Sequence, residues 1–591
     1  MLAPHHQATT RLTSTLLFSL SRRAVQSTSR GVSRRRPTGA AQHPSTPRGG
    51  MPRRRPPTAA ALASAALAAA PEPPLPAALS DPGPDVRDDA PGVHSPAPCP
   101  RTGEDLPYSR SPALEFRVLA RQGRARAAAL RLPRHAALTP CFMPVGTQGA
   151  VKGLLPSQLL ALDCHIVLGN TYHLGNRPGA AAVAALGGLP RASGWPRAML
   201  TDSGGFQMVS LLHLAEVTER GVEFASPVDG SRMLLTPEQS VAIQNALGAD
   251  VLMALDDVVP ATCDDPRRFA EATGRTTRWL DRCLRAHARR DEQNLFPIVQ
   301  GGFDVRLRAR SLRDLVARDA PGYAIGGLAG GETKDAFWRV VAQCAAGLPP
   351  GKPRYVMGIG YPLDIVVCSA LGCDMYDSVY PTRTARFGVA LTDRGTLRLK
   401  HAACASDPRP IDPDCSCLAC ARHTRAYLHA TISRALPSAA SLVSLHNVAY
   451  TQRLTRRLRA AILAGTLPEF VRAFVSAHFG GDPAAVPQWV VDALDVAGID
   501  LTGVAALRPA HDYFEHEAFG GRRDGDLVEY PVGEEAVAAA DRAGAQQDAA
   551  LIMAGAAQAA QAAVGADRAG AEQDAALMAA EPAEGQKSDE R

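Results

Sequence analysis

The stretch TPEQSVAIQNALGADVLMALDD, Thr236–Asp257, contains one complete helix–strand unit and indicates an α/β fold. Thr236 is a favourable N-cap, Pro237 suits the first helical position, and Gln239 completes a capping box. Gly248 is placed to end this helix, because glycine readily adopts the left-handed conformation at a helix C-terminus. These signals predict a helix that leads directly into a strand.

The apolar run 251–255 follows that helix, reads as a buried strand, and ends at Asp256 and Asp257. Further apolar runs end in the same way: 198–201 before Asp202, 296–299 before Gln300, 323–325 before Gly326, 355–357 before Gly358, and 375–376 before Asp377. A (β/α)8 barrel builds its active site from polar groups at the C-terminal ends of successive strands. We therefore predict such a barrel. A doubly wound open sheet is the alternative, but no GxGxxG follows a strand.

Three acidic residues stand out: Asp202 in TDSGGFQ, Asp256 in ALDD and Asp377 in MYDSVYPTRTARFG. A single aspartate is most often an N-cap or a loop residue. Three at the ends of predicted strands, beside glycines that let the backbone approach a flat ligand, favour a site. Paired carboxylates suit glycosidic-bond chemistry, one as nucleophile and one as acid/base.

Charge is unevenly distributed along the 591 residues. Residues 1–71 hold 11 Arg and no Asp or Glu, and the first acid is Glu72. Residues 72–591 then hold 53 basic and 58 acidic side chains, a formal charge of −5. Binding of nucleic acid by the folded part must therefore rest on local basic patches.

The two ends of the chain are low in complexity. Residues 1–108 form a leader rich in Arg, Ser, Pro and Ala, which is either a transit peptide for a mitochondrion or plastid or a disordered leader. The Ala-rich tail contains an imperfect repeat, at 540–551 and 566–577. No run approaches the roughly 20 apolar residues of a membrane span.

The chain has 12 Cys, and Cys415, Cys417 and Cys420 form a dense CxCxxC motif. Such clustering predicts a metal site rather than a disulfide framework, and a reducing compartment. Spacing alone leaves the fourth ligand open, and the candidates nearby are Cys404, His423, His429 and His446.

Six segments together resemble the tRNA-guanine transglycosylases: FMPVGTQGAVKG (142–153), LGNTYHL (168–174), TDSGGFQ (201–207), SPVDGS (226–231), MGIGYPLDIV (357–366) and YPTRTARFG (380–388). The resemblance runs from about Ala113 to about Gly480, in order and with matching spacing. It implies an irregular (β/α)8 barrel with a zinc-binding insertion. We assign residues 109–400 to the catalytic barrel, 401–480 to the zinc subdomain and closing helices, and 481–591 to a C-terminal extension.

The family mechanism implies a role for two of the acids. Asp377 would attack the ribose C1′ of the target guanosine, and Asp202 would be the proton acceptor and donor. The resemblance further implies that queuine replaces the wobble guanine of GUN-anticodon tRNAs (Asp, Asn, His and Tyr), through a covalent Asp–ribose intermediate.

The family also implies binding residues for the base and the RNA. The base-binding residues would be Asp202, Ser203, Gly204, Gly205, Phe206, Asp256, Gln300, Gly327 and Met357. Phe206 and Met357 would sandwich the ring, and bacterial relatives usually have Tyr in place of Phe206. The anticodon loop would contact Gly358, Ile359, Gly360, Tyr361, Pro362, Leu363, Asp364, Thr382, Arg383, Thr384, Ala385 and Arg386, with the arginines binding phosphates or guanine edges.

Two positions point to queuine as the incoming base. Bacterial relatives usually read GLAVGE where this chain has Gly330 in GLAGGE, and Glu-Cys where it has Asp257 and Val258. A smaller residue at Gly330 would leave room for the cyclopentenediol arm of queuine, although this glycine could also serve only a tight turn.

The family takes its fourth zinc ligand from an HN motif, which His446 and Asn447 match, so one structural Zn²⁺ is expected. It also implies a heterodimer with a non-catalytic homologue and a cytoplasmic location. That homologue is itself a rival identity, but it should lack Asp202 and Asp377. The archaeal enzyme normally carries C-terminal RNA-binding modules, and a barrel metallohydrolase would need His clusters at strand ends; this sequence has neither.

Overall fold

The structure is a computed structural model that describes residues 106–205, 216–225, 232–261 and 263–502. Residues 1–105 of the predicted leader, the Ala-rich tail repeat and Phe206 lie outside the described residues, so the predictions made for them stay predictions; the first strand already begins at Tyr108. Within the described ranges, no helix has the length and apolar character needed to cross a membrane.

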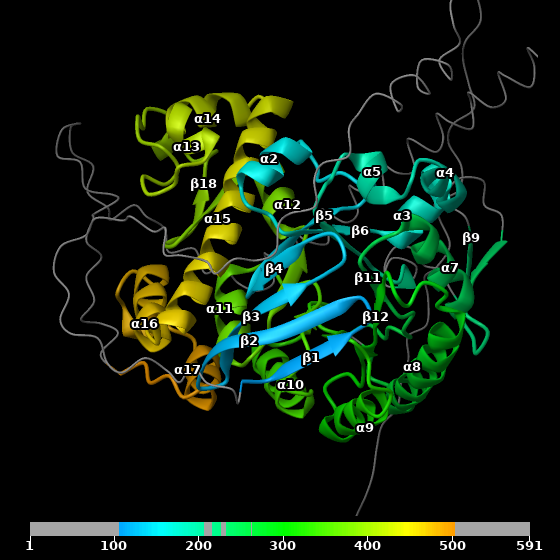
Figure 1. The fold of residues 1–591 in the computed structure, drawn as a ribbon. Coiled ribbons are helices and arrows are strands. Elements are labelled where there is room, and N and C mark those ends of the chain that lie inside the picture. Colours follow the sequence, from blue (N-terminus) through cyan, green and yellow to red (C-terminus); the bar gives the residue numbers. More distant parts are fainter. Residues whose placement is uncertain (1–105, 206–215, 226–231, 262, 503–591) are drawn as a thin grey trace, which may run out of the picture. The chain divides into compact units, whose positions relative to one another are not determined.

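Parallel strands form the centre of the fold (Figure 1). The described sheet has nine strands, or eight when β12 and β13 are taken as one. In chain order they are β5 (Cys141–Gly146), β6 (Ile166–Gly169), β7 (Ala198–Thr201), β11 (Val251–Met253), β12 (Asn294–Phe296) continued by β13 (Ile298–Val299), β14 (Tyr323–Ile325), β15 (Arg354–Val356) and β16 (Met375–Ser378). Each strand pairs with the next in the chain, and β16 pairs with β5. Pro297, which has no N–H to donate, divides one strand into β12 and β13. The sheet therefore closes, and the predicted barrel is confirmed.

Strand boundaries differ little from those expected. β7 and β14 match the predicted runs, whereas β11 ends at Met253 instead of Leu255. The neighbouring β7 ends at Thr201, which is opposite Leu252, so β11 has no partner on that side beyond this point.

Side chains on the strands alternate between the barrel interior and the surrounding helices. Leu168, Leu200, Ile298, Ala324, Tyr355 and Met375 face inward and share one hydrophobic cluster. An antiparallel sheet of β1 (Tyr108–Ser111), β2 (Leu114–Gln122), β3 (Ala125–Arg131) and β4 (Ala136–Thr139) adds Phe116 and Leu130 to this cluster. Arg126 and Arg134 of this sheet and its turns reach Asp374 and Asp250, at the starts of β16 and β11. The sheet thus covers the N-terminal end of the barrel.

Helices lie between the strands and surround them (Figure 1). They are α2 (Pro156–Ala161), α3 (Thr171–Leu174), η1 (Gly175–Gly179), α4 (Ala180–Ala185), α5 (Leu189–Ser193), α7 (Pro237–Leu247), α8 (Pro266–Ala286), α9 (Val305–Val316), α10 (Lys334–Gly347), α11 (Pro362–Ala370) and α12 (Tyr380–Arg386). The strands β8 (Glu216–Val217), β9 (Val222–Ala225) and β10 (Arg232–Leu235) precede α7. The predicted capping box of α7 is confirmed, because Gln239 N donates to Thr236 Oγ1 (3.1 Å) and Thr236 N donates to Gln239 Oε1 (3.0 Å).

A second group of elements follows the barrel. It comprises β17 (Val389–Thr392), β18 (Gly395–Arg398), η2 (Ala402–Cys404), α13 (Leu418–Arg422), α14 (Arg425–Ile432), α15 (Pro437–Ala464), α16 (Leu467–His478), η3 (Pro483–Ala485) and α17 (Gln488–Val496). The long helix α15 lies against β5, where Gln452 Nε2 donates to the carbonyl of Phe142 (2.9 Å). Val490 and Leu494 of α17 are buried in the core cluster that contains α10 and α11, so the packed structure continues beyond residue 480.

Candidate active site

The candidate functional residues continue the inward-facing rows of the barrel strands. Because strand side chains alternate with a period of two, the residue two positions after an inward-facing one faces the same way. The pairs are Leu168 and Asn170, Leu200 and Asp202, Ile298 and Gln300, Ala324 and Gly326, Tyr355 and Met357, and Met375 and Asp377. These six positions therefore meet at the C-terminal mouth of the barrel.

Asp377 lies at the end of β16 and is half-buried. Its Oδ1 accepts hydrogen bonds from Tyr355 Oη (2.5 Å) and from the Gly358 amide (2.8 Å). Burial raises the pKa of the Asp377 carboxyl, which the two donors oppose. Burial, together with the carboxylates of Asp377 and Asp202, raises the pKa of the Tyr355 phenol well above its usual value, so this residue stays a neutral donor. Among the residues that the structure describes, the Asp377 carboxylate is thus held in place by neutral donors.

Asp202 follows β7 and is held by the segment that begins α3. Asn170 Nδ2 donates to Asp202 Oδ2 (2.6 Å), and the Thr171 amide donates to Oδ1 (2.8 Å). Asn170 also caps α3, because its Oδ1 accepts from the His173 amide (3.0 Å). Both oxygens of Asp202 therefore have neutral donors, and the side chain is nearly buried.

Asp256 lies beyond the end of β11 and has a different pair of neutral donors. Gln300 Nε2 donates to Asp256 Oδ2 (2.7 Å), and Ser203 Oγ donates to Oδ1 (3.3 Å). Burial raises the pKa of Asp256 to about 6, and the charge of Asp257 adds to this rise. Asp257 itself binds Arg275 (2.6 Å) and Arg268, so its charge is compensated. The two adjacent aspartates are therefore electrostatically unlike.

Gly326 and Gly327 bring the backbone close to Gln300. A Cβ at Gly327 would lie 2.4 Å from Gln300 Oε1, and one at Gly326 would lie 2.5 Å from Ile298 Cγ2 and 3.6 Å from Met357 Sδ. Gly327 also has a φ of +69°, which side-chain-bearing residues seldom adopt. Hence Asp256, Gln300, Gly327 and Met357, which the family resemblance implies as base-binding residues, lie together.

The segments predicted to contact RNA are only partly exposed. Gly358 is exposed, whereas the side chains of Ile359, Pro362, Asp364, Thr382 and Ala385 are buried. Asp364 pairs with Lys334 Nζ (2.6 Å), and burial raises the pKa of its carboxyl. Buried side chains cannot reach RNA in this conformation, so they support the loop. Tyr361, Leu363, Thr384, Arg383 and Arg386 are partly exposed, and α12 places both arginines directly after the Asp377 strand.

Gly330 and Val258 lie on two loops that approach each other. Val258 is buried, whereas Gly330 is exposed, and a Cβ at Gly330 would lie 3.4 Å from Ala261 Cβ, an ordinary contact. Glu332 accepts hydrogen bonds from the amides of Ala329 (2.7 Å) and Gly330 (2.8 Å). The loop of Gly330 thus has a fixed backbone next to the segment that follows Asp256.

The predicted metal ligands form one cluster away from the barrel mouth. One ligand atom from each of Cys415, Cys417, Cys420 and His446 lies within 4.8 Å of the others, and His446 Nδ1 is 3.2 Å from Cys420 Sγ. His446 Nε2 is 2.8 Å from the carbonyl of Leu391, which fixes Nε2 as the protonated nitrogen and leaves Nδ1 to bind a metal. Three thiols and one imidazole in a closed arrangement fit a structural zinc.

The other candidates for the fourth ligand have different surroundings. His429 Nδ1 is 2.9 Å from the carbonyl of Leu399, and the His423 ring stacks on Tyr427. Cys404 Sγ is 3.8 Å from the carbonyl of Arg398. The structure therefore brings only His446 of these candidates into the described metal-binding cluster.

Three residues in or near the site were given no role from the sequence. Asn170 and Tyr355 hold the two acids, and the period-two pattern of their strands could have identified both. Asn447, next to His446, accepts from the Leu391 amide (2.9 Å) and donates to the carbonyls of Pro381 and Val389 (both 2.9 Å). It thereby links α15 to α12 and β17, and no spacing rule reveals this contact.

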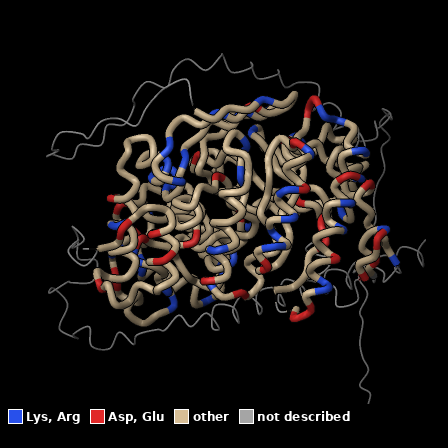
Figure 2. Tube along the Cα trace, turned by 90° about the horizontal axis from the view of Figure 1, so that it is seen from below, with Lys and Arg blue, Asp and Glu red and all other residues tan. Residues whose placement is uncertain are grey.

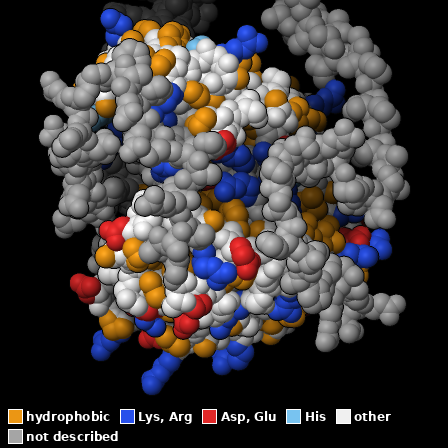
Figure 3. All heavy atoms as spheres, turned by 90° about the vertical axis from the view of Figure 1, so that its left-hand side faces the viewer, with side chains coloured by type: hydrophobic (Ala, Val, Ile, Leu, Met, Phe, Trp, Pro, Cys, Tyr) orange, Lys and Arg blue, Asp and Glu red, His pale blue; other side chains and the backbone are white. Residues whose placement is uncertain are grey.

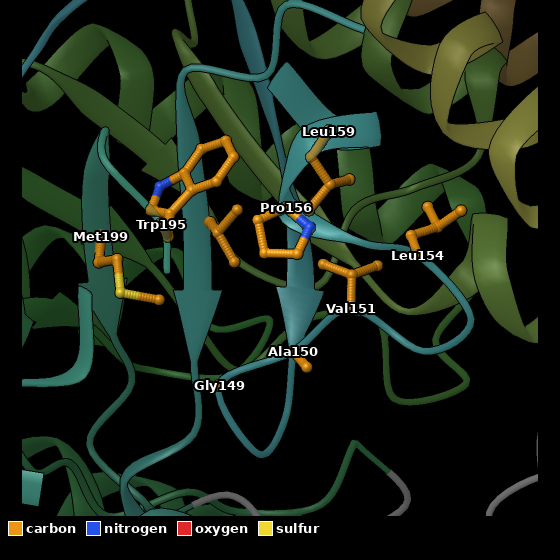
Figure 4. Close-up of a pocket in the computed structure, with 9 residues that line it drawn as sticks. Gly149, Ala150, Val151, Leu154, Pro156, Leu159, Trp195 and Met199 are labelled. Carbon is orange, nitrogen blue, oxygen red and sulfur yellow. The ribbon is translucent and has the colours of Figure 1, made fainter. Parts of the chain in front are cut away.

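The surface charge and a second pocket do not indicate another active site among the described residues. Basic and acidic residues are interspersed over the trace in Figure 2. The face in Figure 3 has basic side chains near its centre with apolar ones beside them. A separate small pocket lies outside the barrel strands, between β6, β7 and α2 (Figure 4). It is lined by Val151, Leu154, Leu159, Trp195, Met199 and other apolar residues, so it offers no group for acid–base chemistry.

Comparisons with known proteins agree with this geometry. The family model described as Queuine tRNA-ribosyltransferase matches residues 121–480. The chain is 49% identical over 402 residues to the Queuine tRNA-ribosyltransferase catalytic subunit of Schizosaccharomyces pombe, and 49% identical over 402 residues to that of Caenorhabditis elegans. These matches cover 66% of this chain and 99% and 100% of the relatives. The Queuine tRNA-ribosyltransferase of Deinococcus radiodurans is 47% identical over 382 residues, which is 64% of this chain and 95% of the relative.

Proposed function

The chain belongs to the queuine tRNA-ribosyltransferase family, and from this premise we propose that it replaces a guanine in tRNA with queuine. The enzyme is a pentosyltransferase, also termed a tRNA-guanine transglycosylase. We further propose that its target is the wobble guanine of the GUN-anticodon tRNAs for Asp, Asn, His and Tyr.

The reaction would proceed by double displacement. The Asp377 carboxylate attacks the ribose C1′, the C1′–N9 bond breaks, and guanine leaves with a proton supplied through Asp202. The incoming base returns a proton to Asp202, its N9 attacks C1′, and Asp377 is released as a carboxylate. Two inversions at C1′ give net retention, as in a retaining glycosidase.

The base would bind at the mouth of the barrel. Asp256 accepts from the N–H edge of the ring, and Gln300 forms a further hydrogen bond to the base. The Gly327 amide donates to the 6-carbonyl. Met357 and Phe206 cover the two faces, because stacking is the usual way to hold an extruded base. Ser203, Gly204 and Gly205 form the adjacent wall.

The anticodon loop would bind beside the nucleophile. Arg383 and Arg386 are partly exposed on α12, which starts three residues after Asp377. Their planar guanidinium groups suit phosphates and guanine edges. Gly358 adds exposed backbone, while the buried residues around it set the shape of the loop.

The convergence of Asp202, Asp256 and Asp377 at one end of the barrel, all with neutral hydrogen-bond donors, supports this proposal best. The test is incorporation of labelled guanine, and separately of queuine, into tRNA by the full-length chain. Unlabelled tRNA after prolonged incubation, with and without a partner subunit, would reject the function.

We also propose that Cys415, Cys417, Cys420 and His446 hold one structural zinc. Zinc there would tie the loop before α13 to α15, and its binding would contribute directly to folding. Metal analysis should find about one zinc per chain, and Cys417→Ala should lose the metal and solubility together. A zinc-free protein that keeps full activity would reject this assignment.

Two further proposals concern context. The eukaryotic relatives are named catalytic subunits, which supports a heterodimer with a non-catalytic homologue. A pull-down that recovers this chain without a partner would count against the heterodimer. The family suggests a cytoplasmic enzyme, whereas 11 Arg without an acid in residues 1–71 suggest import into a mitochondrion or plastid. A fluorescent reporter fused to those residues distinguishes the two locations.

A further inference from the structure

Arg308, in the first turns of α9, is a completely buried cation directly below the base site. Its side chain forms no ion pair with an acidic residue in the described part of the chain. Instead, Nε donates to the carbonyl of Gly302 (2.8 Å), Nη1 to that of Val299 (2.7 Å) and Nη2 to that of Gly326 (2.9 Å). Burying a charge without a contacting carboxylate is costly, so the three carbonyls, with the Cys344 side chain beside them, stabilise it.

These carbonyls belong to the two segments that carry Gln300 and Gly327. Val299 directly precedes Gln300, and Gly302 follows it by two residues. Gly326 directly precedes Gly327, at the C-terminal end of the neighbouring strand β14. The Gly326 amide also donates to the Val299 carbonyl (3.1 Å), so both sides of that turn are fixed. A Cβ at Gly327 would lie 3.4 Å from Arg308 Nη2, which places the guanidinium next to this residue.

The Gly326 carbonyl and the Gly327 N–H belong to one peptide group. A cation that binds the carbonyl oxygen withdraws electron density from the amide, and this makes the N–H a stronger donor. The effect is largest where water is excluded and no carboxylate contacts the cation; Glu332 acts on Arg308 only through its charge at longer range. The Gly327 amide makes no backbone hydrogen bond among the described residues, so it is available to a ligand.

We propose that Arg308 is a positioning residue for base recognition, which aligns and polarises the Gly326–Gly327 peptide so that Gly327 N–H binds the 6-carbonyl of the base more tightly. This inference rests on the proposed function, in which that amide contacts the base. Burial lowers the pKa of Arg308, but arginine starts so far above neutrality that the side chain remains charged. Lysine would keep the charge but could not reach three carbonyls with a planar fork.

The test compares two competitive inhibitors of guanine exchange: 7-deazaguanine, and 2-amino-7-deazapurine, which lacks the 6-oxygen and with it the N1 proton. Each variant is compared with the wild type on the same inhibitor, so the missing N1 proton affects both proteins alike. The variants are Arg308→Lys and Arg308→Gln, with Arg306→Lys as the matched control, because Arg306 is exposed on the same helix. Each Arg308 variant should bind 7-deazaguanine roughly three- to tenfold more weakly, the worth of about one hydrogen bond. Binding of the analogue without the 6-oxygen should change less than twofold, and Arg306→Lys should change neither.

Equal weakening for both inhibitors would overturn the proposal, because it would mean a general disturbance of the pocket. Failure of both Arg308 variants to fold, judged by circular dichroism beside Arg306→Lys, would assign the residue to the fold and overturn it as well. If the wild-type enzyme exchanges guanine but binds the two inhibitors equally, the contact to Gly327 is wrong while the proposed function stands. Absence of any exchange by the wild type would reject the function itself.

Discussion

At the starts of β11 and β16, Asp250 and Asp374 are buried against arginines, whereas at the ends of the same strands Asp256 and Asp377 have neutral donors. Asp374 binds Arg126 through both oxygens (2.9 and 2.5 Å) and also accepts from the Arg354 amide (2.7 Å). Each strand thus carries one acid that is paired with an arginine and one that has neutral hydrogen-bond donors.

This difference separates stability from chemistry along a single strand. A carboxylate bound by a guanidinium is a poor nucleophile, because the cation stabilises its lone pairs and occupies its oxygens. Asp377, held by a phenol and an amide, keeps an available oxygen, and its charge is stabilised less. The N-terminal end of the barrel therefore supports the fold, as in other (β/α)8 barrels, and the C-terminal end carries the acids that we propose act in the reaction.

The largest effect is expected at the reactive end. Asp377→Asn should lower base exchange roughly 10⁴-fold or more, in keeping with the removal of other catalytic nucleophiles. The amide is isosteric but cannot attack C1′, so affinity for tRNA should change little. The measurement is a denaturing gel of enzyme, tRNA and a guanine analogue, in which only the wild type should give a shifted covalent band.

Burial raises the pKa of Asp377, so the neutral amide should not lower the free energy of unfolding. Denaturant unfolding of Asp377→Asn should therefore match the wild type or exceed it. A normal covalent band from this variant would show that Asp377 is not the nucleophile. A large loss of stability would contradict the difference proposed between the N-terminal and C-terminal ends of the strand.

Asp374, three residues before Asp377, should give the opposite result, a loss of stability with little loss of activity. Asp374→Asn leaves Arg126 buried without its counterion, and breaking a buried ion pair in this way costs about 3–5 kcal/mol of stability. Folded enzyme should keep kcat within about twofold, because Asp374 is at the other end of the strand. Urea unfolding and the kinetics of the folded fraction test both points; a stable but inactive variant would contradict the comparison.

Asp256 should show a smaller effect that depends on pH. Its pKa, raised by burial to about 6, means that the folded chain binds this proton more tightly than the unfolded chain. The resulting contribution to stability is present in acid and is lost as pH rises through about 6. At pH 7 the ionised carboxylate costs at most about 3 kcal/mol, from roughly two pKa units at 1.36 kcal/mol each.

Asp256→Asn should consequently be more stable than the wild type, by an amount that grows between pH 4 and pH 7, while it binds the base less well. In the wild type, the KM for guanine should rise as the pH falls below about 6, because the carboxylate that accepts from the ring becomes protonated. Stability profiles of the two proteins that remain parallel over this range would show that Asp256 does not titrate there.

The barrel could be predicted from the sequence more completely than the site. Short apolar runs that end in Asp, Gln or Gly were sufficient to predict the strands, because each run carries its own boundary. Their closure into a barrel also followed, but the early end of β11 depends on where the neighbouring β7 ends. The metal ligand His446 needed the family resemblance, since spacing left four candidates.

Side-chain partners were the part that sequence could not supply. Asp250, Asp256, Asp374 and Asp377 all look alike as residues next to apolar runs, and only the folded chain shows which ones face an arginine. Likewise, Asp364 belongs to a segment predicted to bind RNA, yet it is buried and pairs with Lys334. Long-range pairing of this kind depends on the order of elements around the barrel, which no local pattern encodes.

The smallest predicted effect concerns the choice of base at the reactive end. Gly330 has an exposed position, and its amide is bound by Glu332, so a side chain there should leave the backbone in place. A Cβ would make an ordinary 3.4 Å contact with Ala261, but the two methyl groups of valine would extend further into this gap. Gly330→Ala should therefore be tolerated for both bases, and it serves as the control.

Gly330→Val should selectively weaken the use of queuine, because guanine has no cyclopentenediol arm to clash with the added methyl groups. Overfilling a packed site costs roughly 1–3 kcal/mol, so kcat/KM for queuine should fall about five- to 150-fold while guanine exchange is spared. The measurement is kcat/KM for both bases with the same tRNA. Equal loss for both would mean that the loop backbone moved despite Glu332. An unchanged preference would mean that Gly330 does not border the arm, and the substrate would then be defined only as a 7-deazaguanine of unknown size.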